Sequence, residues 1–165
     1  MKSRLIAIST LLSATFFLVG CLQSPLLHHA DSASKARASA TRELSQCTLT
    51  FSQVGLCASL DWVKMPAEDE KGEFTLRFWN QNQGTENGPY VHPAQTVFVK
   101  LFMPAMGHGS SPVRTSQLKD NSGSSIPGIF DVSEVYFVMP GAWQIIVQLR
   151  NGQQTVDQAI LNVEI

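Results

Sequence analysis

The chain has 165 residues, with 12 Lys and Arg against 13 Asp and Glu, a net charge of −1 at pH 7 and 44% hydrophobic residues. This length accommodates one ordinary domain with flanking segments. The balanced charge excludes the strongly basic surface that nucleic-acid binding requires, and the sequence contains no polybasic segment for binding anionic lipid.

The first 20 residues have the organisation of a secretory signal peptide. Lys2 and Arg4 precede an apolar segment at residues 5–19, which is too short for a stable membrane-spanning helix. This segment ends in Leu18-Val19-Gly20-Cys21, which resembles the lipobox of bacterial lipoproteins. In that motif the cysteine is lipidated and becomes the mature N-terminus. The alternative is an ordinary secretory signal with an incidental cysteine.

Lipidation at Cys21 would anchor the chain to a membrane, because each buried methylene contributes about 0.8 kcal/mol. Leu22 rather than Asp follows the cysteine. By resemblance to enterobacterial sorting rules, this residue permits transfer to the periplasmic side of an outer membrane, in an organism that has one. Removal of residues 1–20 takes away Lys2 and Arg4 and leaves 10 Lys and Arg against 13 Asp and Glu, which is mildly acidic.

Residues 21–45 are predicted to be a lipidated, flexible tether. Ser, Ala and short polar residues dominate residues 30–45, and such a composition buries too little apolar surface to offset the entropy of ordering. His28 and His29 form a pair within it that either binds a metal ion or is simply solvated. The tether therefore leads into a single folded domain at residues 46–165.

The domain has the pattern of an all-β protein. Short apolar runs alternate with Gly, Pro, Asn and Ser, and no long helical period occurs. Period-two alternation with frequent turns predicts an antiparallel β-sandwich, and Asn151-Gly152 predicts a hairpin. The long connections at residues 81–95 and 107–128 are of a kind that often carries function. The sequence predicts about seven strands, at residues 47–54, 57–65, 73–80, 96–103, 130–139, 142–150 and 156–165.

The alternation also predicts which side chains form the core. Each strand with a clear period should place one set of apolar residues inward. The sets that share one face of a strand are Phe74, Leu76 and Phe78; Val97, Val99 and Leu101; Trp143, Ile145, Val147 and Leu149; and Leu161, Val163 and Ile165, of which the last set is expected to point inward.

Cys47 and Cys57 remain as an even pair in a compartment that favours disulfides. A bridge between them would close a loop of about ten residues and stabilise the fold by roughly 2–3 kcal/mol. The rival interpretation is a pair of thiolate metal ligands. Their spacing differs from the two-to-four-residue knuckles of zinc sites, so the sequence favours the disulfide.

Two turns carry the candidate chemistry. Residues 103–109 read Met-Pro-Ala-Met-Gly-His-Gly, and residues 139–141 read Met-Pro-Gly. Thioether sulfur and imidazole are the donors that suit Cu(I), so the candidate metal ligands are Met103, Met106, His108 and Met139. His92 is a further candidate donor.

A purely structural interpretation of the same turns is also open. Met103 and Met139 would then fill gaps at strand ends, because Met is a common core filler. Gly107 and Gly141 would serve tight turns, and His108 would form hydrogen bonds.

The two motifs together resemble a known family. Met-Pro-Ala-Met-Gly-His is followed, after about thirty residues, by Tyr-Phe-Val-Met-Pro-Gly-Ala-Trp-Gln-Ile-Ile-Val at residues 136–147. This arrangement resembles the YtkA-like/FixH-like domain and covers residues 73–165. The matching positions are Met103, Met106, His108, Met139 and Trp143. The resemblance implies an immunoglobulin-like β-sandwich in the cell envelope and copper handling as its context.

The sequence predicts that the chain is not an enzyme. His92 and His108 are the only histidines in the domain, so few general bases exist. Gly107-His108-Gly109-Ser110 lacks the Gly-x-Ser-x-Gly nucleophile elbow. Asp131 and Glu134 are three residues apart and would point to opposite faces of a strand.

Two hypotheses follow from these patterns. In the first, the chain is a membrane-anchored envelope lipoprotein whose sandwich binds Cu(I) through the Met/His cluster. In the second, the sandwich is a structural or protein-interaction module without metal. Exposed aromatic residues, with Trp62, Trp79 and Tyr90 as the candidates, would then contact an envelope protein partner.

Overall fold

A computed structural model describes residues 47–67 and 70–165, and nine strands form this part of the chain. The predicted signal peptide, the lipidation site Cys21 and the tether lie outside the described residues. Within 47–67 and 70–165, no helix has the length and apolar character needed to cross a bilayer. The strands are β1 (Leu49–Phe51), β2 (Leu56–Lys64), β3 (Gly72–Asn80), β4 (Thr96–Met103), β5 (His108–Gly109), β6 (Arg114–Lys119), β7 (Ser125–Val135), β8 (Ala142–Asn151) and β9 (Gln154–Glu164).

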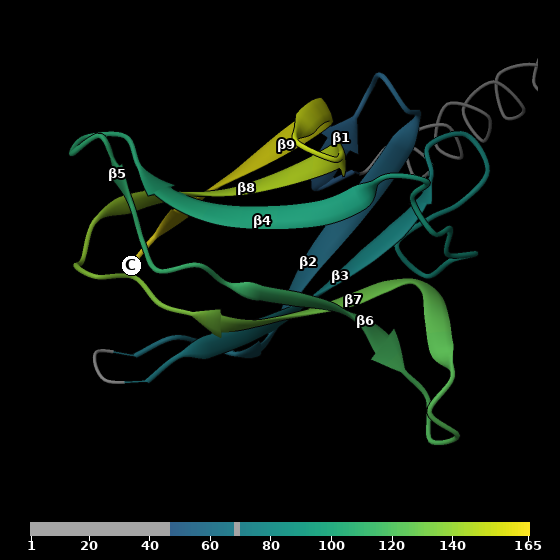
Figure 1. The fold of residues 1–165 in the computed structure, drawn as a ribbon, viewed down its shortest axis with the longest axis horizontal. Coiled ribbons are helices and arrows are strands. Elements are labelled where there is room, and N and C mark those ends of the chain that lie inside the picture. Colours follow the sequence, from purple (N-terminus) through teal and green to yellow (C-terminus); the bar gives the residue numbers. More distant parts are fainter. Residues whose placement is uncertain (1–46, 68–69) are drawn as a thin grey trace, which may run out of the picture.

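The strands form two antiparallel sheets that face each other (Figure 1). The five-stranded sheet has the order β1-β2-β3-β7-β6, and the four-stranded sheet has the order β5-β4-β8-β9. The orders β2-β3-β7-β6 and β4-β8-β9 correspond to strands ABED and CFG of the immunoglobulin fold. The predicted immunoglobulin-like antiparallel β-sandwich is therefore confirmed.

The core lies between the two sheets and follows the predicted alternation. The inward residues of β3, β4 and β8 are all buried, and those of β9 are partly buried against them. Complete burial of one large apolar side chain contributes about 1.5–3 kcal/mol, so this layer supplies most of the favourable free energy of folding. The largest fully buried side chains are Trp79, Trp143, Phe51, Phe74, Phe78, Leu49, Leu76, Ile145 and Leu149.

The strand boundaries differ from the prediction in the segment between β4 and β8. Residues 107–128, which we expected to be a long connection, contain β5, β6 and the beginning of β7. Conversely, β7 ends at Val135, so residues 136–139, which we predicted to belong to a strand, lie in the connection to β8. β6 is an edge strand, and Leu118 is the one large apolar residue in it. β6 therefore forms because its backbone pairs with β7, and not because its apolar residues alternate.

The beginning of the domain is fastened to the rest of the fold at two points. Cys47 and Cys57 form the predicted disulfide, which joins the start of the described chain to β2. The predicted first strand is shorter than expected and covers Leu49–Phe51 alone. Just after it, the backbone N–H groups of Gln53 and Val54 donate to the buried carboxylate of Asp157 on β9, at 2.7 and 3.3 Å. These bonds link the edges of the two sheets.

One of the aromatic residues expected at the surface is buried. Trp79 is covered by the connection between β3 and β4, where it pairs with Tyr90 through an isolated bridge. A Cβ at Gly84 would lie 2.8 Å from the Cβ of Trp79, so this loop packs closely on the indole. The expectation of an exposed Trp79 is therefore wrong, because the loop forms a lid on the outer face of β3.

A pair of carboxylates lies on the outer face of the five-stranded sheet. Asp131 on β7 pairs with Thr75 on β3, and a register shift between Gly72 and Phe74 brings Glu73 next to it. Partial burial raises the pKa of Asp131 to about 6, and the hydrogen bond and negative charge of Glu73 act in the same direction. The Asp131 carboxylate therefore binds a proton more tightly in the folded protein than in the unfolded chain.

This pair predicts a pH dependence of stability. The group titrates near pH 3.8 when unfolded and near 6 when folded, so its contribution to the unfolding free energy is present below pH 3.8 and is lost as the pH rises through 6. We expect Asp131→Asn to be more stable than the wild type at pH 7.5, and this advantage should shrink towards pH 4. Urea denaturation at several pH values measures it.

Asp120→Asn is the control for this experiment. The hydroxyl of Ser122 and the backbone N–H of Ser124 donate to Asp120 and lower the pKa of its carboxyl. Its stabilising effect is therefore lost only at pH values below those at which Asp131 titrates. Asp120→Asn should keep the wild-type slope between pH 4 and 6, and an unchanged slope in Asp131→Asn would contradict the prediction.

Candidate functional site

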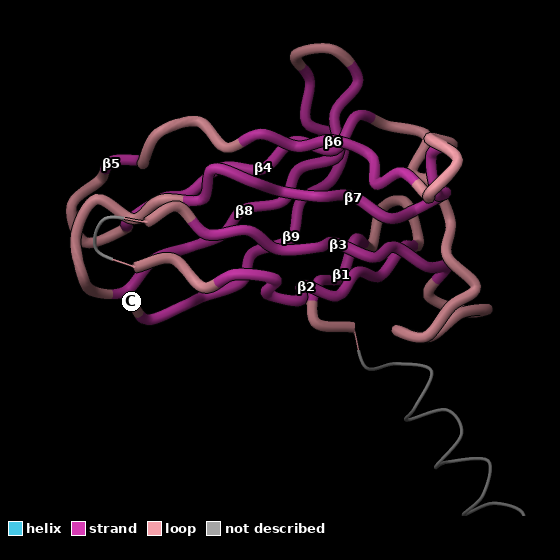
Figure 2. The backbone as a smooth tube through the Cα atoms, turned by 90° about the horizontal axis from the view of Figure 1, so that it is seen from below, coloured by secondary structure: helices cyan, strands magenta, loops and turns pink. Residues whose placement is uncertain are grey.

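All four methionines of the described residues lie at one end of the sandwich, which we call the methionine end. It is formed by the last residues of β2, β4, β7 and β9 and the first residues of β3 and β8, together with β5. Figure 2 shows β5 and the C-terminus at this end. The methionines are Met65, Met103, Met106 and Met139.

Three of the four predicted donors belong to one tight turn between β4 and β5. Met103 ends β4 and pairs with His108 of β5. The N–H groups of Met106 and Gly107 donate to the Met103 carbonyl at 3.2 and 2.9 Å, and Gly107 has φ 66°. Glycine adopts this left-handed conformation without a steric penalty. The turn therefore folds the chain back so that His108 lies beside Met103.

The fourth predicted donor, Met139, lies in the connection between β7 and β8. The indole N–H of Trp143 donates to the Met139 carbonyl at 3.0 Å. Immediately afterwards, Gly141 and Ile165 exchange two backbone hydrogen bonds, of 2.8 and 3.1 Å, which fix the end of the connection to the C-terminus. Both contacts hold the Met139 segment against the same end of the sandwich as His108.

Trp143 connects the two turns through its ring as well as its N–H group. The indole is buried, and its ring packs edge-on against two other rings. Its centroid lies 6.0 Å from that of the His108 imidazole and 5.3 Å from that of the Phe137 ring. One aromatic side chain therefore contacts β5 and both sides of the Met139 turn. The position of His108 relative to Met139 depends on this contact.

Gly141 brings the buried thioether of Met103 close to the second turn. A Cβ at Gly141 would lie 3.2 Å from the terminal methyl carbon of Met103, and Gly141 has φ 127°. A glycine is required at position 141 for two reasons, because other residues rarely adopt this backbone conformation and because a side chain would meet the Met103 methyl group. The structure thus places Met103, His108 and the Met139 turn at the same end of the sandwich.

The candidate donors differ in their access to solvent. Met103 is 4% exposed, Met139 36% and Met106 61%. The Nδ1 atom of His108 lies 3.1 Å from the Gly109 carbonyl oxygen. A carbonyl oxygen only accepts, so Nδ1 carries the proton in this contact and Nε2 keeps the lone pair that binds a metal. The set combines one inner thioether with an imidazole and two outer thioethers.

The structure does not bring His92 to this group. Its ring stacks on Phe130 at 5.5 Å, and its Nδ1 lies 3.4 Å from the Gln117 amide nitrogen. This place is near the beginning of β4, whereas Met103 ends the same strand. Within 47–67 and 70–165, no group of three or more His, Cys, Asp or Glu side chains is arranged to hold a metal ion.

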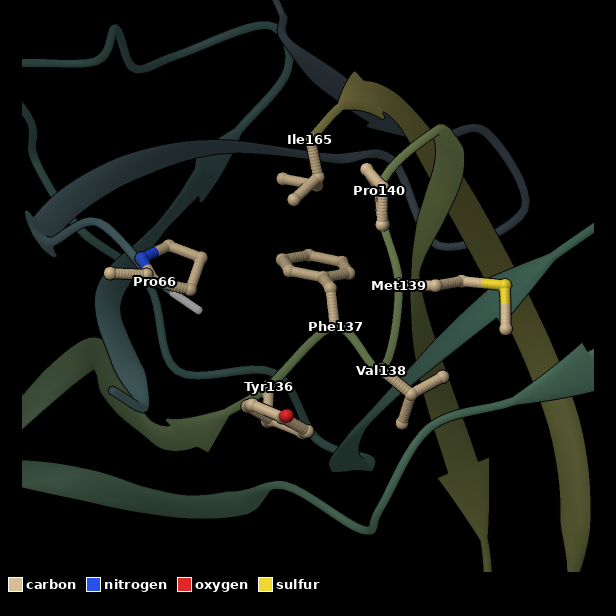
Figure 3. Close-up of a pocket in the computed structure, with 8 residues that line it drawn as sticks. Pro66, Tyr136, Phe137, Val138, Met139, Pro140 and Ile165 are labelled. Carbon is tan, nitrogen blue, oxygen red and sulfur yellow. The ribbon is translucent and has the colours of Figure 1, made fainter. Parts of the chain in front are cut away.

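A pocket of about 650 Å³ opens beside the Met139 turn (Figure 3). Phe137 and Ile165 face each other across it, and the Met139 side chain points away from Phe137 on the other side of the backbone. Sequence reasoning missed this pocket because residues 136–139 were assigned to a strand. The lining residues are Pro66, Ala67, Tyr136, Phe137, Val138, Met139, Pro140 and Ile165.

Comparisons of the chain with family models, with curated proteins and with solved structures give no match. The resemblance to the YtkA-like/FixH-like domain therefore stays a prediction. The fold and the arrangement of side chains at the methionine end are the observations from which a function can be argued.

Replacement of Gly141 tests the contact that joins the two turns. Gly141→Val should lower the unfolding free energy by roughly 1–3 kcal/mol, because a β-branched residue is strained at φ 127° and its Cβ would displace Met103. Denaturant unfolding followed by tryptophan fluorescence measures this loss.

Gly107→Val is the matched control. Gly107 also has a positive φ, but a Cβ there would meet nothing within 4 Å. We therefore expect backbone strain alone and a smaller loss of stability than at Gly141. An equal loss of stability in the two variants would show that the contact between Gly141 and the Met103 methyl group does not contribute to stability.

Proposed function

We propose that the chain is a membrane-anchored lipoprotein of the bacterial cell envelope whose β-sandwich binds Cu(I) at the methionine end. The ion would be bound by Met103, Met106, His108 and Met139. Lipid at Cys21 would anchor the protein to the membrane. The observation that supports this proposal most strongly is that two turns 30 residues apart in the sequence meet around Trp143.

The donor chemistry supports a soft, monovalent metal ion. Thioethers bind Cu(I) well, whereas Zn²⁺ favours Cys, His and carboxylate ligands. The four candidate donors are three thioethers and one imidazole, and none carries a negative charge. When bound, Cu(I) would have low coordination and no charged ligand, so the chain would serve as a carrier or store of the ion.

The geometry of attachment supports a site that faces away from its anchor. The described chain begins at Cys47, which the disulfide joins to the second residue of β2. The methionine end lies where β2 ends, at Lys64, seven residues beyond Cys57. A strand advances by about 3.3 Å per residue, so the two places are about 20 Å or more apart. A tether that enters near Cys57 leaves the methionine end free for exchange with a partner.

Anaerobic titration with Cu(I) against a competing chromogenic chelator tests the metal site. We expect one Cu(I) per chain for the full chain carrying Cys21→Ser, which removes a competing thiol. Met106→Leu combined with His108→Ala should lower the affinity by about tenfold or more, since even outer-shell partners of metal ligands change affinity by about 10–100-fold.

Met65→Leu is the control for that titration. Met65 lies at the same end and is similarly exposed, at 58% against 61% for Met106, but it follows β2 in the other sheet and is not a proposed ligand. Its replacement should leave the affinity unchanged. Equally weak binding by the parent chain and the double variant would refute the metal site.

Metabolic labelling with palmitate tests the anchor. In a bacterial host the wild-type chain should incorporate the label, and Cys21→Ser should incorporate none and retain residues 1–20, because the lipidated cysteine directs signal removal. A Cys47→Ser/Cys57→Ser variant should still be labelled. Equal labelling of the Cys21→Ser chain would contradict lipidation at this residue.

Docking of an envelope protein without metal is the second candidate function, and the pocket beside Met139 favours it. Its volume of about 650 Å³ lies in the range of ligand pockets, and its walls present both polar and apolar surface. Val138 and Met139, which are both exposed, border it. A chain that binds no Cu(I) would make this pocket the functional feature of the methionine end.

A further inference from the structure

The four methionines of the described residues form a graded series of exposure at one end of the fold. Met106 and Met65 are 61% and 58% exposed, Met139 is 36% exposed, and Met103 is 4% exposed. The core elsewhere in the described part is filled by Phe, Trp, Leu, Ile and Val instead. Oxidisable thioethers are therefore concentrated at the methionine end, and they differ mainly in access to solvent.

Thioether chemistry gives this gradient a consequence. Hydrogen peroxide transfers one oxygen atom to the sulfur: an S–O bond forms, the O–O bond breaks, the sulfur is oxidised and water leaves. The product is methionine sulfoxide, which is polar and chiral. Its sulfur has lost the soft donor character that suits Cu(I).

Met106 is the most exposed methionine among the proposed ligands. It lies in the turn between Met103 and Gly107, where its N–H donates to the Met103 carbonyl and fixes the backbone. Open space lies beside Gly107 in this turn, since a Cβ there would meet no atom within 4 Å. Met103 is shielded in the same turn, because it packs against Gly141. One of the proposed ligands is therefore reactive while its neighbour in the turn is protected.

We propose that Met106 is a site of sulfoxidation by peroxide and that its oxidation lowers the affinity of the methionine end for Cu(I). The second half of this inference rests on the proposed Cu(I) site. The protected Met103 and the imidazole of His108 would remain, so the oxidised domain keeps its fold and loses one donor. The turn then reports peroxide in the envelope through loss of bound metal.

The order of oxidation tests the first half without copper. The full chain carrying Cys21→Ser is treated with hydrogen peroxide in detergent, and oxygen incorporation at each methionine is followed by peptide mass spectrometry. Met106 and Met65 should react first, Met139 later and Met103 last. Oxidation of Met103 before Met106 would overturn the proposal.

Protection by a metal tests whether Met106 is a ligand. Ag(I) is a soft ion like Cu(I) but does not cycle with peroxide, so it is the suitable probe. Bound Ag(I) should slow the oxidation of Met106 at least severalfold and leave Met65 unchanged. Equal rates at Met106 with and without Ag(I) would overturn the role of Met106 as a ligand.

The affinity measurement completes the test. In the Met65→Leu chain, Cu(I) affinity is measured before peroxide treatment and after Met106 has gained one oxygen. We expect a loss of about tenfold or more. A Met106→Leu/Met65→Leu chain is the control, and the same treatment should leave its affinity unchanged.

The starting material separates two kinds of failure. If the untreated chain binds no Cu(I), the proposed function fails together with the inference that depends on it. If the untreated chain binds Cu(I) and the Met106 sulfoxide binds it equally well, the inference alone is wrong and the metal site stands.

Discussion

The indole of Trp143 fills the core at the methionine end and makes apolar and polar contacts at the same time. Its ring packs on Phe137 and faces the His108 imidazole, and its N–H group bonds to the Met139 carbonyl. A buried indole without a partner for its N–H would be costly, so the backbone of the Met139 turn has to lie within reach. The packing of the core and the position of the candidate donors are therefore parts of one arrangement.

This arrangement also explains why the candidate donors come from strand ends rather than from strand centres. The inward-facing side chains at the centre of β4 and β8 are needed to fill the space between the sheets, and they are buried accordingly. At the last layer the sandwich has no further core to fill. Met103 can then belong to the core while it lies next to solvent-exposed residues of the same turn. A thioether at the end of β4 is therefore shielded by the core on one side and lies next to exposed residues of the turn on the other.

The sequence was sufficient to predict the elements in which apolar alternation decides the structure. β3, β4 and β8, the Asn151-Gly152 hairpin and the disulfide agree with the prediction. β6 was missed because an edge strand with one large apolar residue carries no periodic signal, and its pairing with β7 is a matter of backbone hydrogen bonds. Trp79 was assigned to the surface because alternation along a strand does not show which loop covers its outer face.

The candidate site was predictable as a set of residues but not as a set of contacts. Met103, Met106, His108 and Met139 follow from two motifs in the sequence. That the Trp143 ring faces His108, or that Gly141 leaves room for the Met103 methyl group, depends on how β4, β5 and β8 pair, and these contacts join residues far apart in the chain. The carboxylate pair of Asp131 and Glu73 arises in the same way, from a register shift between β3 and β7.

The disulfide between Cys47 and Cys57 has a mechanical consequence for a chain that is held at one end. A pull on the residues before Cys47 is transmitted through the sulfur atoms to Cys57, within β2. β2 is paired with β1 on one side and with β3 on the other, whereas β1 has three residues and lies at the sheet edge. Tension therefore bypasses β1, the shortest strand of its sheet, and loads a strand that is paired on both sides. Residues 48–56 lie inside the disulfide loop and outside this path of force. We therefore expect the bonds from Gln53 and Val54 to Asp157 to stay in place under load.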